Sequence, residues 1–110
     1  MKKLLNFDEA FDRLCQGAPL IAGQVLGVAL KRVVWIAEWH VPGCLSENQE
    51  FCNTKEQAIN TACLMAMNGD EEVPRGMKKA LRLHHRFDSK TDLYGTVINT
   101  ISKHTLHDLL

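Results

Sequence analysis

Residues 33 to 41 place the strongest constraint on the fold of this chain. The odd positions form an unbroken apolar face, namely Val33, Trp35, Ala37, Trp39 and Val41. The even positions start apolar at Val34 and Ile36 and end polar at Glu38 and His40. Successive side chains of a strand point to opposite faces of the sheet. We therefore predict a strand over Val33–Val41 that is buried on both faces at its start and on one face at its end, within a sheet that carries packed helices.

Two more strands are predicted beside this one. Ile21–Leu30 is rich in Val, Leu and Gly and lacks the charge pattern of a surface helix, which favours a strand. Pro42-Gly43 predicts a turn after Val41, and a polar loop then leads to a short strand near Glu50–Cys52. Together these segments predict a three-stranded antiparallel sheet.

Two helices have clear starting signals. Asn6 and Glu9 have capping-box spacing before a helix over Phe7–Gln16, and Gly17 is the expected stop. Its predicted inner face is Phe7, Ala10, Phe11, Leu14 and Cys15. Thr54 and Gln57 predict a second capped helix that ends at Asn68-Gly69. Its predicted inner face is Ala58, Ile59, Ala62, Cys63, Ala66 and Met67.

The last third of the chain is predicted to be helical. Pro74 suits the first turn of a helix over Val73–Phe87. A further helix is predicted over Thr91–Leu109 because its apolar residues recur at steps of three and four. The many β-branched residues there leave a strand open for residues 93–105.

The predicted fold is therefore a small single α+β domain over residues 1–110, with the order α-β-β-β-α-α-α. A three-stranded antiparallel sheet packs against helices. Residues 6–69 form an α-β core, and residues 73–110 form a helical tail packed on it. With 45% apolar residues, a chain of this length can bury a core of its own.

The sequence favours a cytoplasmic protein without a membrane segment. Asp8, Glu9 and Asp12 interrupt any signal-peptide core, and the apolar stretch Ala18–Leu30 is shorter than the ~20 residues that span a bilayer. Its cysteines, which form no Cys-x-x-Cys pair, are expected to be free thiols. They are Cys15, Cys44, Cys52 and Cys63.

No catalytic signature is present, so we expect no enzyme activity and no cofactor. Gly-x-Ser-x-Gly is absent, and Gly23 and Gly27 are not followed by the Gly-Lys-Ser/Thr of a phosphate loop. His104-x-x-His107 has the spacing of a zinc-ligand pair but has no partner pair of cysteines. We therefore predict no metal site.

One charged feature stands out in a chain whose net charge is zero. Between Arg75 and Lys90 lie six basic residues against one acid, Asp88. On the predicted helix the basic residues recur at steps of three and four along about 16 Å. This predicted basic stripe, which suits phosphates or an acidic protein face, comprises Arg75, Lys78, Lys79, Arg82 and Arg86, with His85 at its edge.

A short motif resembles a known family. Thr54-Lys55-Glu56-Gln57-Ala58, followed by Ala62, resembles the opening of the second helix of double-stranded RNA-binding domains, and the predicted order α-β-β-β-α matches that family. The resemblance implies that Lys55 holds phosphate. Glu56 and Ile59 stand where the family has further basic residues. We do not assign the chain to this family.

A second predicted binding surface is the end of the strand at Trp39, His40 and Pro42, where a tryptophan can anchor a partner. We expect a non-enzymatic small binding protein that acts by protein–protein interaction, as an inhibitor, immunity protein or accessory factor of a bacterium, phage or mobile element. The alternative is a nucleic-acid-binding module that uses the basic helix 75–90. A protein partner is favoured over nucleic acid. The sequence leaves the partner's identity and the oligomeric state open.

Overall fold

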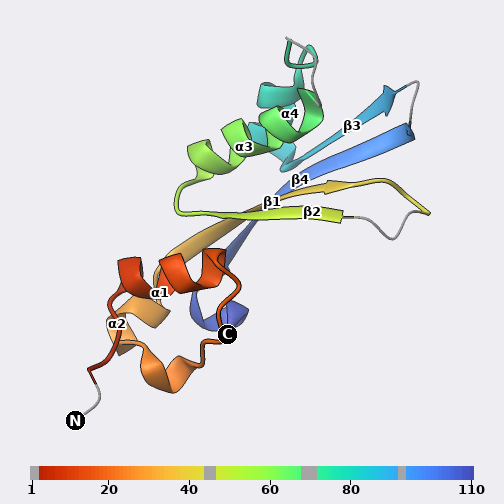
Figure 1. The fold of residues 1–110 in the computed structure, drawn as a ribbon. Coiled ribbons are helices and arrows are strands. Elements are labelled where there is room, and N and C mark those ends of the chain that lie inside the picture. The colour runs from red at the N-terminus through yellow and green to blue at the C-terminus, as the bar shows by residue number, and fades with distance from the viewer. Residues whose placement is uncertain (1–2, 44–46, 68–71, 92–93) are drawn as a thin grey trace. The chain divides into compact units, whose positions relative to one another are not determined.

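The computed structural model describes residues 3–43, 47–67, 72–91 and 94–110 of the chain. Its fold is α+β, with a four-stranded antiparallel sheet and helices (Figure 1). The described elements, in chain order, are α1 (Phe7–Cys15), the 3-10 turn η1 (Ala22–Gln24), α2 (Gly27–Leu30), β1 (Val33–His40), β2 (Glu47–Cys52), α3 (Lys55–Met67), α4 (Met77–His84), β3 (Arg86–Thr91), β4 (Gly95–Thr105) and the 3-10 turn η2 (His107–Leu109). None of the described helices is long and apolar enough to cross a membrane.

The sheet has the strand order β2-β1-β4-β3. Two antiparallel pairs flank its centre: β1 pairs with β2 from Trp35↔Cys52 to His40↔Glu47, and β3 pairs with β4 from Arg86↔Thr100 to Thr91↔Gly95. The predictions of the β1 and β2 strands are confirmed. The prediction of three strands in the order α-β-β-β-α-α-α is wrong, because the last third of the chain supplies two strands.

The chain divides into two compact units. Unit 1 comprises Met1–Val34 and Lys103–Leu110, and unit 2 comprises Trp35–Ser102. The core of unit 1 contains Phe7, Ala10, Val25, Ala29, Val34 and Leu106. The core of unit 2 contains Trp35, Ile36, Ala37, Val41, Cys52, Ala58, Ile59, Ala62, Cys63, Met77, Leu81, Val97 and Ile101.

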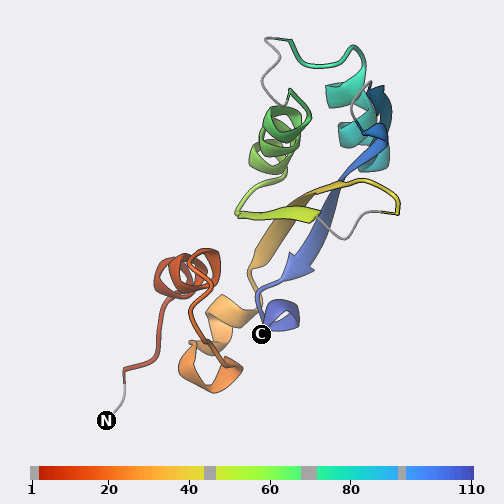
Figure 2. The same ribbon diagram turned by 45° about the vertical axis from the view of Figure 1, so that its right-hand side comes forward.

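Within unit 2, α3 and α4 lie side by side on one face of the sheet (Figure 2). The side chain of Trp35 points to this face, because its ring contacts His85 at the end of α4 and lies below the ammonium of Lys55 at the start of α3. Trp35 is 8% exposed and Ile36, on the opposite face, is 4% exposed. The prediction that β1 is buried on both faces at its start is confirmed.

The two capped helices are confirmed, with small differences. At α1, the Glu9 N–H donates to Asn6 Oδ1 (2.9 Å) and the Asn6 N–H donates to Glu9 Oε1 (3.2 Å). Cys15, predicted on the inner face of α1, is exposed instead, since it lies at the helix end. At α3, the Gln57 N–H donates to Thr54 Oγ1 (3.1 Å). The predicted stop of α3 at Asn68-Gly69 lies outside the described residues.

The strand predicted over Ile21–Leu30 is wrong. This segment forms η1 and α2, and only Val25 joins a single parallel bridge, to Leu5. Gln24 folds the chain locally, because its Oε1 accepts from the Ile21 N–H at 3.0 Å. Glycine within a strand interior is unfavourable, so Gly23 and Gly27 favour these short turns over an extended ladder.

The helix predicted over Val73–Phe87 is shorter than expected at both ends. Gly76 adopts φ +81° and His85 adopts φ +59°, both left-handed, so α4 is limited to Met77–His84. Pro74 lies before the helix, and its carbonyl accepts from the Met77 N–H at 3.2 Å. Beyond His85 the chain extends into β3.

The helix predicted over Thr91–Leu109 is wrong, and the strand that the β-branched residues left open is present as β4. Val97, Asn99 and Ile101 are buried at alternate positions, which is the period of a strand. Because Ile98 is also apolar, the apolar residues Val97, Ile98 and Ile101 are separated by steps of three and four, which is the spacing of a helix. Thr91, where the predicted helix was to begin, is the last residue of β3, and residues 92–93 lie outside the described residues.

Candidate functional site

The predicted basic stripe does not form one helix face. Arg75 precedes α4, His85 is its left-handed cap, and Arg86 begins β3. Only three of its residues lie on α4: Lys78, Lys79 and Arg82. The prediction of one continuous helical stripe is wrong, because the backbone turns at His85.

Two of these cations have carboxylate partners. Arg82 Nη2 lies 2.8 Å from Glu56 Oε1 on α3. Arg86 donates to both carboxylate oxygens of Asp88, from Nε at 2.8 Å and from Nη2 at 3.0 Å. The hydrogen bonds raise the pKa of Arg86 and lower the pKa of Asp88. A phosphate at either guanidinium would have to compete with these carboxylates.

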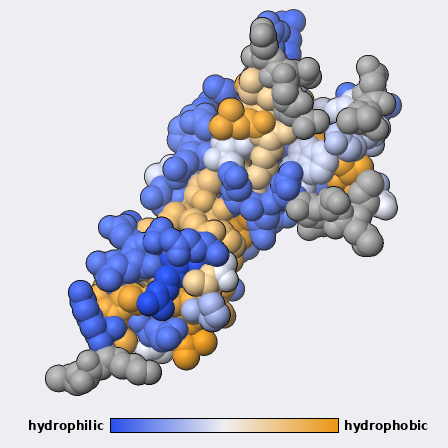
Figure 3. Space-filling model, in the orientation of Figure 1, coloured by the Kyte–Doolittle hydropathy of each residue, from blue (hydrophilic) through white to orange (hydrophobic). Residues whose placement is uncertain are grey.

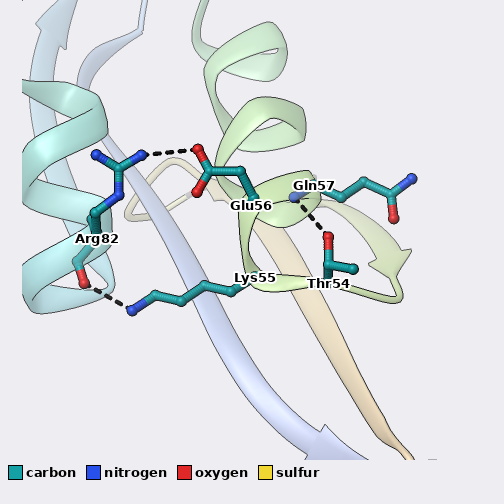
Figure 4. Close-up of polar contacts among 5 residues, drawn as sticks. All are labelled: Thr54, Lys55, Glu56, Gln57 and Arg82. Carbon is teal, nitrogen blue, oxygen red and sulfur yellow. Dashed lines mark hydrogen bonds and ion pairs between the residues drawn. The ribbon is translucent and has the colours of Figure 1, made fainter.

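Lys55 joins the two helices of unit 2, as Figure 4 shows. Its Nζ donates to the backbone carbonyl of Arg82 at 2.9 Å, and it lies 5.8 Å from the centre of the Trp35 ring. A cation is favoured at the C-terminal end of a helix, where carbonyls lack partners. The Lys55 ammonium, which the family resemblance would assign to phosphate, therefore stabilises the end of α4.

The predicted surface at Trp39, His40 and Pro42 contains a further aromatic residue. The rings of Trp39 and Tyr94 meet edge to face, with centroids 5.4 Å apart. Tyr94 is 41% exposed, Trp39 and His40 are half-buried, and Pro42 is exposed. Sequence reasoning missed Tyr94 because it took this region for a helix rather than the start of a strand. Cys44, which is expected to be a free thiol, lies outside the described residues.

The exposed apolar side chains of unit 1 were not predicted. Val28 on α2 is 76% exposed, and Ile21 is 65% exposed. Leu4, Leu26 and Leu110 are exposed as well. Leu5 and Val25 form a parallel bridge that brings the segments of Leu4 and Leu26 together, and the Leu26 N–H donates to the Leu5 carbonyl at 2.9 Å. Apolar atoms of unit 1 reach the surface in the lower part of Figure 3.

Three grooves lie among these residues of unit 1. The first, of about 310 Å³, is lined by Asn6, Phe7, Leu26, Val28, Ala29 and Arg32. The second, of about 430 Å³, is lined by Gly27, Leu30, Lys31, Thr105 and His107. The third, of about 260 Å³, is lined by Lys3, Leu4, Leu5, Arg13, Gly23 and Gln24. The first two grooves both use residues of α2. We call these grooves, with Leu4, Leu26 and Val28, the α2 surface.

The α2 surface is apolar with cationic margins. Lys31 lines one groove beside α2, and Arg32 lines the other. The guanidinium of Arg32 stacks on the ring of Phe7, 4.3 Å from its centre. No carboxylate lines any of the three grooves among the described residues. The lining of the three grooves therefore combines apolar side chains with positive ones.

The described residues form no site for metal or thiol chemistry. They contain no group of three or more His, Cys, Asp or Glu side chains that could hold a metal ion. His104 lies on β4 and His107 on η2, so the predicted pair does not share a helix. Burial raises the pKa of the Cys52 and Cys63 thiols, which makes both poor nucleophiles at neutral pH.

Comparisons of the chain with protein-family models, with curated proteins and with solved structures found no match.

Proposed function

We propose that this chain is a non-enzymatic binding protein that acts by protein–protein interaction, and that the α2 surface is its main contact. One observation carries the proposal: unit 1 exposes Val28, Leu26 and Leu4, and each of these side chains lines a groove. Contiguous apolar patches on a folded protein commonly mark interaction sites. An inhibitor, immunity protein or accessory factor of a bacterium, phage or mobile element acts by covering a surface, and such a role requires no catalytic group.

The Trp39–Tyr94 pair is a second candidate contact. A tryptophan and a tyrosine that are partly exposed and already packed together lose little side-chain entropy on binding. The half-buried His40 and the exposed Pro42 border this pair on the same strand end. We propose this pair as a secondary anchor.

Capture of the partner tests the proposal. We expect tagged full-length protein, expressed in the organism that encodes it, to recover one protein in near-stoichiometric amount. Val28→Asp should reduce that recovery at least about tenfold, because docking would have to remove water from a carboxylate placed on the apolar contact. Leu83→Asp is the matched control, since Leu83 on α4 is 61% exposed and lies in unit 2. Quantitative mass spectrometry of the captured fractions measures both variants.

Neither substitution should disturb folding. Both side chains are largely exposed, and substitutions at such surface positions usually change stability by no more than about 0.5 kcal/mol. Circular dichroism spectra that match the unsubstituted protein would establish this. Equal recovery by Val28→Asp and by the unsubstituted protein, or recovery of no stoichiometric protein, would contradict the proposal.

Nucleic-acid binding is the alternative. Arg75, Lys78 and Lys79 are exposed, and no ion pair joins them to a carboxylate among the described residues. Three phosphate contacts predict a log–log salt slope of about −2.7 on duplex DNA, since each contributes about −0.9. Binding titrations from 50 to 200 mM salt, with Lys78→Glu plus Lys79→Glu as the test variant, measure this slope. A flat response would exclude the alternative.

A further inference from the structure

We infer that the partner presents to the α2 surface a segment in which apolar side chains are interleaved with acidic ones. This inference rests on the proposed function, because it names the chemistry of the partner at that same surface. The apolar side chains would enter the grooves, and the carboxylates would lie at the cationic margins.

The grooves have the size and lining for side chains. Two of them, of about 310 and 430 Å³, lie at the lower end of the range for small-ligand pockets, and the third, of about 260 Å³, lies just below it. Two of them use residues of α2, and the exposed Val28 lines one of these two. A peptide segment that crosses α2 would bury Val28 and could place one side chain in each groove.

The cations are placed to receive acids at both grooves. Lys31 and Arg32 are consecutive at the end of α2, yet each lines a different groove. Arg32 is held in place by its stacking on Phe7 and by the hydrogen bond from the Leu106 N–H to its carbonyl at 2.9 Å. Lys3 and Arg13 line the third groove. A guanidinium held in this way loses little freedom when it binds a carboxylate.

Three of the four acidic side chains of unit 1 accept hydrogen bonds from neighbouring groups, and the fourth, Asp8, lies exposed in the first turn of α1. Glu9 completes the cap of α1, Asp12 accepts from Gln16 Nε2 at 3.0 Å, and Asp108 accepts from the Thr105 N–H at 3.2 Å. The described residues provide no ion pair for Lys3, Arg13, Lys31 or Arg32. Complementary charge on a partner would therefore speed association and fix its register.

Other anionic partners fit this surface less well. Helix α2 has four residues, which is far shorter than the amphipathic helices that bind lipid interfaces. Nucleic acid would use the cations but not the apolar grooves, because bases stack on aromatic faces. The aromatic face at these grooves, that of Phe7, is covered by Arg32. An acidic and apolar protein segment uses every feature of the α2 surface.

Peptide selection tests the inference. A random 12-residue peptide library is selected against the full-length protein, and the enriched peptides are synthesised and measured by fluorescence anisotropy. We expect enriched sequences to interleave Asp or Glu with Leu, Ile or Phe. Arg13→Glu plus Lys31→Glu should weaken their binding about tenfold, and the same peptides with Lys for each acid should bind this variant better than the unsubstituted protein. Lys78→Glu plus Lys79→Glu is the charge-matched control and should leave the affinity unchanged.

Several results would overturn the inference. The selection could enrich peptides without acids, or no peptide at all. Acidic peptides could bind the Arg13→Glu plus Lys31→Glu variant as tightly as the unsubstituted protein. The protein could also bind phosphatidylserine vesicles or duplex DNA more tightly than it binds the peptides. Peptides that lose binding on Val28→Asp but ignore the charge reversals would overturn the inference and leave the proposed function standing. If neither Val28→Asp nor the charge variants reduced capture of the partner, the proposed function itself would be contradicted.

Discussion

Leu81→Ala is expected to lower the free energy of unfolding by about 3 kcal/mol, within the range of about 2–5 kcal/mol for buried leucine truncations. Leu81 is fully buried on the side of α4 that packs in the core of unit 2. Truncation removes apolar contacts and leaves a cavity that close-packed neighbours fill only in part. Urea unfolding followed by circular dichroism measures the change.

Leu83→Ala provides the matched control on the same helix. Leu83 is 61% exposed, so the same chemical change should alter stability by no more than about 0.5 kcal/mol. Similar losses for the two variants would contradict the placement of α4, because they would mean that the helix packs through a different face.

Asn99→Leu is expected to stabilise the protein by about 1–3 kcal/mol. The side chain of Asn99 is fully buried on β4, and its Oδ1 and Nδ2 have no hydrogen-bond partner among the described residues. A buried polar group without a partner costs about this much, and leucine has a similar branched shape without the polar atoms. The midpoint of thermal unfolding should rise by about 4 °C for each kcal/mol.

Asn99→Asp tests the same site with the opposite sign. An ionised carboxylate in this position should destabilise the protein by several kcal/mol, because a buried charge without a partner is costly. If Asn99→Leu lowered the unfolding midpoint and Asn99→Asp had little effect, the site would have to be hydrated, and the buried, unpartnered position of Asn99 would be wrong.

Asn99 also explains the largest error in the fold expected from the sequence. A buried asparagine between Val97 and Ile101 interrupts the alternation of apolar residues that identifies a strand, so the apolar steps of three and four, which include Ile98, indicated a helix instead.

Elements with local signals were predicted well. The side-chain caps at Asn6 and Thr54 and the alternation in β1 depend on neighbours in the sequence, and the structure confirms them.

The α2 surface could not be predicted because long-range contacts create it. The bridge between Leu5 and Val25 brings together two segments that are 20 positions apart, and residues 105 and 107 complete a groove whose other side is α2. The sequence showed the cluster of basic residues near α4 but not the carboxylates with which they form ion pairs. Glu56, which pairs with Arg82, lies 26 positions away in the sequence. The basic residues of unit 1 that lack carboxylate partners within the described part of the chain are spread along the sequence, so they form no long basic segment in it.

Hydrogen–deuterium exchange of the full-length protein with its captured partner tests the central claim most directly. If the α2 surface is the main contact, the largest gain in protection should fall on residues 4–7 and 24–32, with a smaller gain at 105–107. Protection confined to α4, or to the region of Trp39 and Tyr94, with exchange around α2 unchanged, would contradict the claim.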